Sequence, residues 1–278
     1  MPETPNFWER LTRAQGEKNS LLCVGLDPER AKLPEAFARR KDGPLEFNKL
    51  VIEATADLAC CYKLNLAFYE AEGLSGLGQM ELTLRRLREA GALVIGDAKR
   101  GDIGSTARAY ARALFDAWGF DAVTVNPLLG RDSLEPFLER EGRGVYVLAQ
   151  TSNPGAADFQ VANSLPEQIA RKVLEWDAKG VCGLVVGATA AAAVKRLREI
   201  APSLPFLLPG VGAQGAKIED FLPAALSPAG APIVVNVSRA VCLPAGEWSP
   251  ERVREAAEGY RGKLSVASTR PSELRITN

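Results

Sequence analysis

The chain has 278 residues, and its 34 Lys and Arg side chains are balanced by 34 Asp and Glu side chains, so the formal net charge is zero. This balance gives no electrostatic reason to expect nucleic acid or an anionic membrane as the main partner. Histidine is absent, which excludes Ser-His-Asp and Cys-His nucleophilic sites as well as imidazole metal sites.

The cysteines and the N-terminal sequence indicate where the protein works. The five cysteines are odd in number, show no Cys-x-x-Cys spacing and lie mostly in apolar runs, which is typical of buried reduced thiols. The N-terminus lacks the apolar segment of a signal peptide, and no run of 18 apolar residues occurs. We therefore expect a cytoplasmic protein that is neither exported nor membrane-spanning.

Short apolar runs alternate with helical segments along the chain. A helix is expected first, over residues 5–16, where it could cover the floor of the fold. Amphipathic segments at 82–90 and 191–200 are examples of the helices that separate the later runs. The eight strand-like runs begin near Leu21, Cys61, Leu93, Ala122, Gly144, Gly183, Phe206 and Ile233. Such alternation predicts parallel βαβ units, and eight units in about 250 residues favour a closed α/β fold, the (β/α)₈ TIM barrel, over an open doubly wound sheet.

The barrel pattern predicts one domain over residues 1–278. Residues 1–20 form its N-terminal helical extension, and residues 265–278 are polar enough to be a loose C-terminal tail. Two loops, 28–43 and 152–163, are longer than a barrel requires. They are either lids or insertions with no catalytic role.

The third strand-like run carries the most informative motif, Asp97-x-Lys99-x-x-Asp102. On a period of two, Ile95, Asp97 and Lys99 share one face of a strand, and buried charges are costly unless they pair. A structural ion pair would explain Asp97 and Lys99 alone. Because Asp102 adds a third charge in the turn before the next helix, we favour a reacting centre.

Other predicted strands also end in polar side chains. Because the active site of a (β/α)₈ barrel lies at the carboxyl ends of its strands, these side chains are expected to converge. Taken singly, most such residues are turn formers or helix caps, and only their convergence favours a site. The residues are Asp27 after the first run, Lys63 and Asn65 in the second, and Thr151, Ser152 and Asn153 after the fifth.

A glycine motif follows the seventh run. Gly210-Val211-Gly212-Ala213-Gln214-Gly215 satisfies G-x-G-x-x-G, but it lies late in the chain, and no acidic residue ends the next strand to bind a ribose. In a barrel, the loops after strands 7 and 8 commonly bind phosphate, and Arg239 would add a bidentate charge. The alternative is that the glycines only permit a tight turn.

Together these motifs resemble the orotidine 5′-monophosphate decarboxylase family, in its longer bacterial (type 2) subgroup. The resemblance covers nearly the whole barrel. It rests on Asp97-x-Lys99-x-x-Asp102-Ile103, Tyr62-Lys63-Leu64-Asn65, Thr151-Ser152-Asn153-Pro154-Gly155, Pro209-Gly210-Val211-Gly212-Ala213-Gln214-Gly215 and Ser238-Arg239.

The resemblance implies the activity and a role for each site residue. Orotidine 5′-monophosphate would be converted to uridine 5′-monophosphate and CO₂, in de novo pyrimidine biosynthesis, without metal or cofactor. Lys63, Asp97, Lys99 and Asp102 would form a charged tetrad, with Asp102 reaching into the neighbouring subunit's site of a homodimer. The implied substrate-binding residues are Asp27 and Thr106 for the ribose, Ser152 for the pyrimidine, Gln214 and Arg239 for the phosphate, and Ile103 and Gly212.

Elementary chemistry agrees with this interpretation. Loss of CO₂ leaves a vinylic carbanion that the ring cannot readily delocalise, and a fixed Lys99 ammonium could stabilise that charge and then protonate the carbon. The alternatives are a Mg²⁺-dependent sugar-phosphate synthase or decarboxylase of the same barrel group, a Schiff-base aldolase acting through Lys99, and a nucleotide-binding regulator without turnover.

Overall fold

Eight parallel strands close into a barrel in the computed structural model, which describes residues 5–161, 163–212 and 215–266. Each strand pairs with the next one along the chain, and β1 returns to β8 with Leu22 opposite Val235. The strands are β1 (Leu22–Gly25), β2 (Cys61–Asn65), β3 (Val94–Arg100), β4 (Ala122–Val125), β5 (Gly144–Gln150), β6 (Cys182–Val186), β7 (Phe206–Leu208) and β8 (Ile233–Val237). The predicted (β/α)₈ barrel is confirmed.

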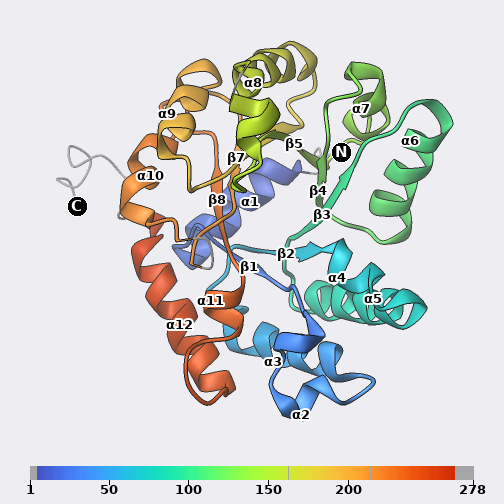
Figure 1. The fold of residues 1–278 in the computed structure, drawn as a ribbon, viewed down its shortest axis with the longest axis vertical. Coiled ribbons are helices and arrows are strands. Elements are labelled where there is room, and N and C mark those ends of the chain that lie inside the picture. The colour runs from blue at the N-terminus through green and yellow to red at the C-terminus, as the bar shows by residue number, and fades with distance from the viewer. Residues whose placement is uncertain (1–4, 162, 213–214, 267–278) are drawn as a thin grey trace.

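Helices surround the barrel as an outer ring (Figure 1). They form because each carries an apolar face: in α8, Ile169, Ala170 and Val173 are buried, while Arg171 and Lys172 are exposed. The ring contains α3 (Gly43–Thr55), α5 (Gly73–Glu89), α6 (Gly104–Ala111), α7 (Arg131–Leu138), α8 (Leu165–Trp176), α9 (Ala191–Ile200), α10 (Ile218–Ala225) and α12 (Pro250–Lys263).

Short helical segments occupy several connections. The predicted loop 28–43 contains η1 and α2, and the predicted loop 152–163 contains η3. A lid role for either loop stays a prediction. The short segments are η1 (Arg30–Lys32), α2 (Glu35–Ala38), α4 (Leu66–Glu70), η2 (Arg112–Ala117), η3 (Ala157–Val161) and α11 (Arg239–Cys242).

The predicted N-terminal helix is α1 (Phe7–Lys18), which covers the amino-terminal end of the barrel (Figure 1). Asn6 and Glu9 start it with a reciprocal capping box. Its buried Phe7, Trp8 and Leu11 pack against an interior layer contributed by every strand. The members of that layer include Cys23, Cys61, Ile95, Ala122, Tyr146, Val185, Leu207 and Val234.

Two features fix α1 at the amino-terminal end of the barrel. Gly144 leaves room for the ring of Phe7, because a Cβ at Gly144 would lie 2.4 Å from Phe7 Cδ1. Polar contacts add orientation: Arg10 Nη1 lies 2.6 Å from Asp121 Oδ1, and Gln15 Nε2 donates a 2.6 Å hydrogen bond to the Ile233 carbonyl. This end of the barrel is therefore closed by apolar packing, and α1 is tied to the starts of β4 and β8.

Part of the predicted domain organisation falls outside the described residues. Residues 267–278, most of the predicted polar tail, lie outside the described residues, so the tail and the single domain over 1–278 stay predictions. Among the helices described, none has the length and apolar content needed to cross a membrane.

Candidate active site

A pocket of about 480 Å³ opens at the carboxyl ends of the strands. The apolar side chains of Leu148, Val185 and Leu207 form part of its wall, and charged groups lie on the other side. The polar lining includes Asp27, Lys63, Asn65, Asp97, Lys99, Thr151, Ser152, Asn153, Asn236, Ser238 and Arg239. The predicted convergence of polar strand ends is thus observed.

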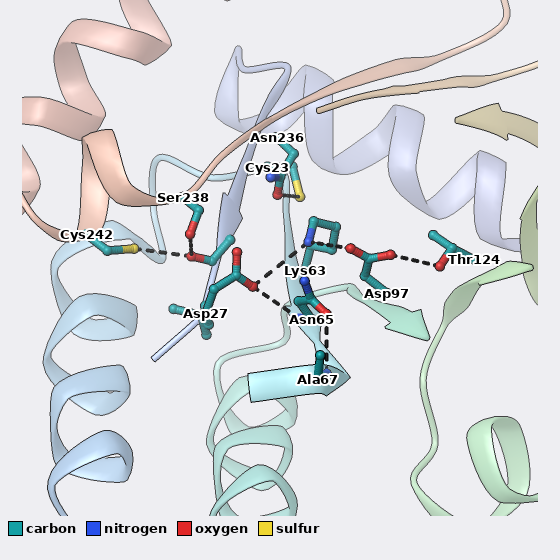
Figure 2. A network of polar contacts seen from close by, with 12 residues as sticks. Cys23, Asp27, Lys63, Asn65, Ala67, Asp97, Thr124, Asn236, Ser238 and Cys242 are labelled. Carbon is teal, nitrogen blue, oxygen red and sulfur yellow. Dashed lines mark hydrogen bonds and ion pairs between the residues drawn. The ribbon is translucent and has the colours of Figure 1, made fainter. Parts of the chain in front are cut away.

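Four charged groups form a row across this pocket. Lys63 Nζ lies 3.1 Å from Asp97 Oδ2 and 3.9 Å from Asp27 Oδ1. Asp97 Oδ1 in turn lies 2.6 Å from Lys99 Nζ. Figure 2 shows Lys63 between the two carboxylates, all of them projecting from neighbouring strand ends. The Lys63 and Asp97 side chains are only 4% and 12% exposed, whereas the Lys99 side chain, which also lines the pocket, is 46% exposed.

The ionised forms of Lys63 and Asp97 stabilise each other. Burial opposes charge on Lys63, but the carboxylates of Asp27 and Asp97 outweigh it and raise the pKa of Lys63 above its usual value. Burial likewise opposes charge on Asp97, and the ammonium groups of Lys63 and Lys99 outweigh it and hold the pKa of Asp97 below its usual value. Lys63 and Asp97 therefore both stay charged at neutral pH.

Lys99 departs from the regular strand that its spacing predicts. The pairing of β3 with β4 shifts between Gly96 and Arg100, and Lys99 has a left-handed backbone with φ of 48°. The side chains of Asp97 and Lys99 are in contact, as expected from the sequence. The alternation of strand faces on which this expectation was based does not continue through Lys99, because the bulge interrupts it there.

Asp27 is held where β1 and β2 end. Its Oδ1 accepts a 3.1 Å hydrogen bond from the Asn65 backbone N–H, in addition to its ion pair with Lys63. The Gly25 carbonyl, two residues before Asp27, accepts hydrogen bonds from Ser238 Oγ and Cys242 Sγ (Figure 2). The β1 end is thus tied to both of its neighbouring strands.

The loops after β5, β7 and β8 line the rest of the pocket. Ser152 contributes after β5, Gly210 after β7 and Arg239 after β8. Gly212 is not part of the lining: its φ is 81°, and a Cβ there would lie 2.7 Å from Ala240 Cβ. Gly212 therefore allows a close approach of this loop to α11. Gln214 lies outside the described residues.

Besides Gly212, three further predicted site residues do not line this pocket. Asp102, Ile103 and Thr106 follow β3 and begin α6, but none of them lines the cavity. Asp102 Oδ1 accepts a 2.8 Å hydrogen bond from the Ile103 backbone N–H. Ile103 is 57% exposed. Within one chain, the Asp-x-Lys-x-x-Asp motif therefore places only its first two charged residues at the pocket.

Sequence reasoning did not select Glu29 and Lys32, which line the pocket after β1, nor two polar residues on the strands themselves. Thr124, on β4, hydrogen bonds to Asp97 and to the Lys99 backbone, and Asn236, on β8, lines the pocket. Both are single polar residues within apolar strand sequences, AVTV and IVVNV. A polar residue at an interior strand position was the available signal.

A family model described as the orotidine 5′-phosphate decarboxylase / HUMPS family matches residues 20–246. The chain belongs to this family.

Relatives and structural neighbours agree with that membership. A protein of Thermomicrobium roseum named orotidine 5′-phosphate decarboxylase is 46% identical over 267 residues, which cover 93% of this chain and 95% of that protein. A protein of the same name from Herpetosiphon aurantiacus is 44% identical, with 91% and 96% covered. The solved structure of Leishmania donovani OMP decarboxylase matches with a TM-score of 0.81 and 36% identity, covering 93% of this chain and 97% of that one.

Proposed function

We propose that the Asp27–Lys63–Asp97–Lys99 row carries the chemistry of an orotidine 5′-phosphate decarboxylase. That activity, a carboxy-lyase reaction of pyrimidine biosynthesis, is supported by the family match, the named relatives and the neighbouring structure together. The observation that carries the mechanism is the half-exposed Lys99 ammonium, which lies 2.6 Å from a buried carboxylate at the pocket wall.

The reaction breaks the bond between C6 of the pyrimidine and its carboxylate. CO₂ leaves, and the electron pair remains on C6 as a vinylic carbanion. Lys99 stabilises that negative charge through its ammonium and then transfers an Nζ proton to C6, which yields uridine 5′-monophosphate. Asp97 orients Lys99, and Lys63 keeps Asp97 ionised. No metal or cofactor has a part in these steps.

The pocket lining supports a binding mode for the nucleotide. In this proposal Asp27 contacts the ribose, Ser152 the pyrimidine, and Arg239 the phosphate beside the Gly210 backbone, all four being lining residues. Gly212 is assigned to the phosphate by the glycine motif and the resemblance, and the side chain of Gln214 by the resemblance alone. An anion held by a guanidinium and backbone groups needs no excess positive charge elsewhere on the molecule.

A homodimer accounts for the residues that do not reach their own pocket. Asp102 would complete the partner's site, as the family resemblance implies, and we infer that Ile103 and Thr106, which follow it in the chain, do the same. Apolar side chains are exposed in the same region: Ile103 after β3 is 57% exposed, and Leu128 and Leu129 after β4 are 66% and 53% exposed. The two loops are neighbours, since the Asn126 N–H donates a 2.8 Å hydrogen bond to the Arg100 carbonyl. Apolar exposure of this kind suits a protein interface.

The Mg²⁺-dependent alternative is not favoured. Both oxygens of Asp97 already accept contacts from ammonium groups, which compete with a hard cation for the carboxylate. The relatives at 42–46% identity are named orotidine 5′-phosphate decarboxylase. We also keep the proposal of a cytoplasmic location, which the five buried free thiols support.

The direct test follows the orotate chromophore by ultraviolet absorption when purified protein meets orotidine 5′-monophosphate with EDTA present. We expect conversion to uridine 5′-monophosphate at an unchanged rate with and without EDTA. Lys99→Ala should lose at least about 10⁴-fold in kcat, since it removes both charge stabilisation and the proton donor. Lys49→Ala, which removes an exposed ammonium paired with Glu46 on α3, should match the wild type. Turnover that requires Mg²⁺ would instead support the sugar-phosphate class.

A further inference from the structure

Thr124 lies opposite the irregular part of β3. In the paired strands, Gly96 is opposite Val123 and Arg100 is opposite Val125, so β3 advances by four residues while β4 advances by two. Thr124 is the single β4 residue that faces this bulge, and it is 1% exposed. The bulge leaves β3 backbone groups that the regular ladder cannot satisfy.

The Thr124 hydroxyl supplies the missing contact and links it to Asp97. Its Oγ1 accepts a 3.0 Å hydrogen bond from the Lys99 backbone N–H and donates a 2.9 Å hydrogen bond to Asp97 Oδ1. The same carboxylate oxygen accepts the Lys99 ammonium at 2.6 Å. Lys99 is thus held at its backbone by Thr124 and at its ammonium by Asp97. Figure 2 shows Thr124 beside Asp97, on the side away from Lys63.

This arrangement opposes the intrinsic preference of the Lys99 backbone. A left-handed φ is unfavourable for a residue with a Cβ, because the Cβ approaches the carbonyl oxygen, and Lys99 has φ of 48°. Such a conformation persists only where surrounding contacts determine it. The hydroxyl of a neighbouring strand is such a contact, whereas a valine of the same shape at position 124 would offer neither donor nor acceptor.

We propose that Thr124 is a positioning residue for decarboxylation, because it holds the bulge of β3 and thereby sets where the Lys99 ammonium lies relative to the substrate carbon. This rests on the proposed function of Lys99 as proton donor. Thr124 does not line the pocket and acts through Lys99 and Asp97. Its loss should therefore reduce kcat much more than it changes KM.

The test compares Thr124→Val, Thr124→Ser and the wild type. We expect kcat of Thr124→Val to fall by roughly 10- to 100-fold with KM changed by less than about threefold, since displacing a catalytic group by about 1 Å can cost 10²-fold. Thr124→Ser retains the hydroxyl and should recover kcat to within about threefold of the wild type. Thr55→Val is the matched control: its buried hydroxyl also makes two hydrogen bonds, to the Val51 carbonyl and the Tyr62 hydroxyl, but it lies on α3. We expect it to lower stability and leave kcat unchanged.

A second readout does not depend on activity. Amide hydrogen exchange should be at least about tenfold faster at Lys99 in Thr124→Val than in the wild type, with the Val123 and Val125 amides unchanged. The proposal is overturned if Thr124→Val keeps wild-type kcat, or if exchange at Lys99 is unaltered. An inactive wild type with accelerated Lys99 exchange in the variant would refute the decarboxylase function while keeping the contact between Thr124 and Lys99.

Discussion

At the scale of residues, the site depends on one carboxylate shared by several donors. Asp97 accepts from Lys63, Lys99 and Thr124, which belong to three different strands. The sequence allowed the lysines and Asp97 to be predicted, because adjacent parallel strands bring their carboxyl ends together. Thr124 was missed although it is a polar residue at an interior strand position. The left-handed Lys99 could not be predicted, since it arises from a register shift that has no local sequence pattern.

The shared carboxylate predicts a pH dependence of stability. Because the folded-state pKa of Asp97 lies below the ordinary value of 3.8, its ionised form contributes stability that is complete above that value and is lost as pH falls through the folded-state pKa. Asp97→Asn should therefore have a lower Tm than the wild type from pH 8 to 5, and the difference should shrink below pH 3.8.

Thermal unfolding at several pH values checks this prediction. Asp116→Asn is the control, because its carboxylate pairs with Arg140 at the surface, where side chains are 46% and 36% exposed. Its effect on Tm should be small at every pH, as is usual for exposed ion pairs. A Tm difference for Asp97→Asn that widens toward acid would contradict the linkage.

At the scale of elements, the sequence pattern predicted the eight strands, the helix α9 and the later part of α5, whose first turns before residue 82 were missed. It identified α1 as an additional helix because residues 5–16 precede the first strand. It did not reveal η1 and α2 within residues 28–43, since segments of three or four residues are too short to show a helical period. Their backbone depends on tertiary contacts, such as Arg30 Nη1 donating to the carbonyls of Ala38 and Arg40.

The close packing of α1 against the amino-terminal end of the barrel predicts that one substitution, Gly144→Ala, destabilises the protein. In Gly144→Ala, the new methyl group would lie 2.4 Å from Phe7 Cδ1 and 3.0 Å from Ala122 Cβ, so the helix or the strand must shift. Overpacking of this kind typically costs about 1–3 kcal/mol in the free energy of unfolding. Urea denaturation should detect it.

The matched glycine is Gly259 in the middle of α12, where a Cβ would meet nothing within 4 Å. Gly259→Ala should increase the free energy of unfolding by about 0.5–1 kcal/mol, because it removes backbone freedom from the unfolded chain. Equal stability of the two variants would show that the contact between Gly144 and Phe7 does not limit the packing of α1.

At the scale of the whole molecule, the proposed homodimer makes each site depend on two chains. Mixing Lys99→Ala with Asp102→Ala protein should restore roughly a quarter of wild-type activity, because half of the dimers would be hybrids and each hybrid would hold one intact site of two. Activity is measured after subunit exchange, which differently tagged chains confirm. Exchange without recovery would show that Asp102 does not act across an interface.

The placement of α1 also determines when the fold can be completed during synthesis. Gln15 Nε2 donates a hydrogen bond to the Ile233 carbonyl, and the Leu21 N–H donates one to the Leu264 carbonyl. The start of the chain therefore cannot make these contacts until residues more than 200 positions later have been synthesised. Contacts of such long sequence separation slow folding. Until β8 leaves the ribosome, Phe7, Trp8 and Leu11 have an incomplete surface to bind, and the nascent chain exposes them to chaperones.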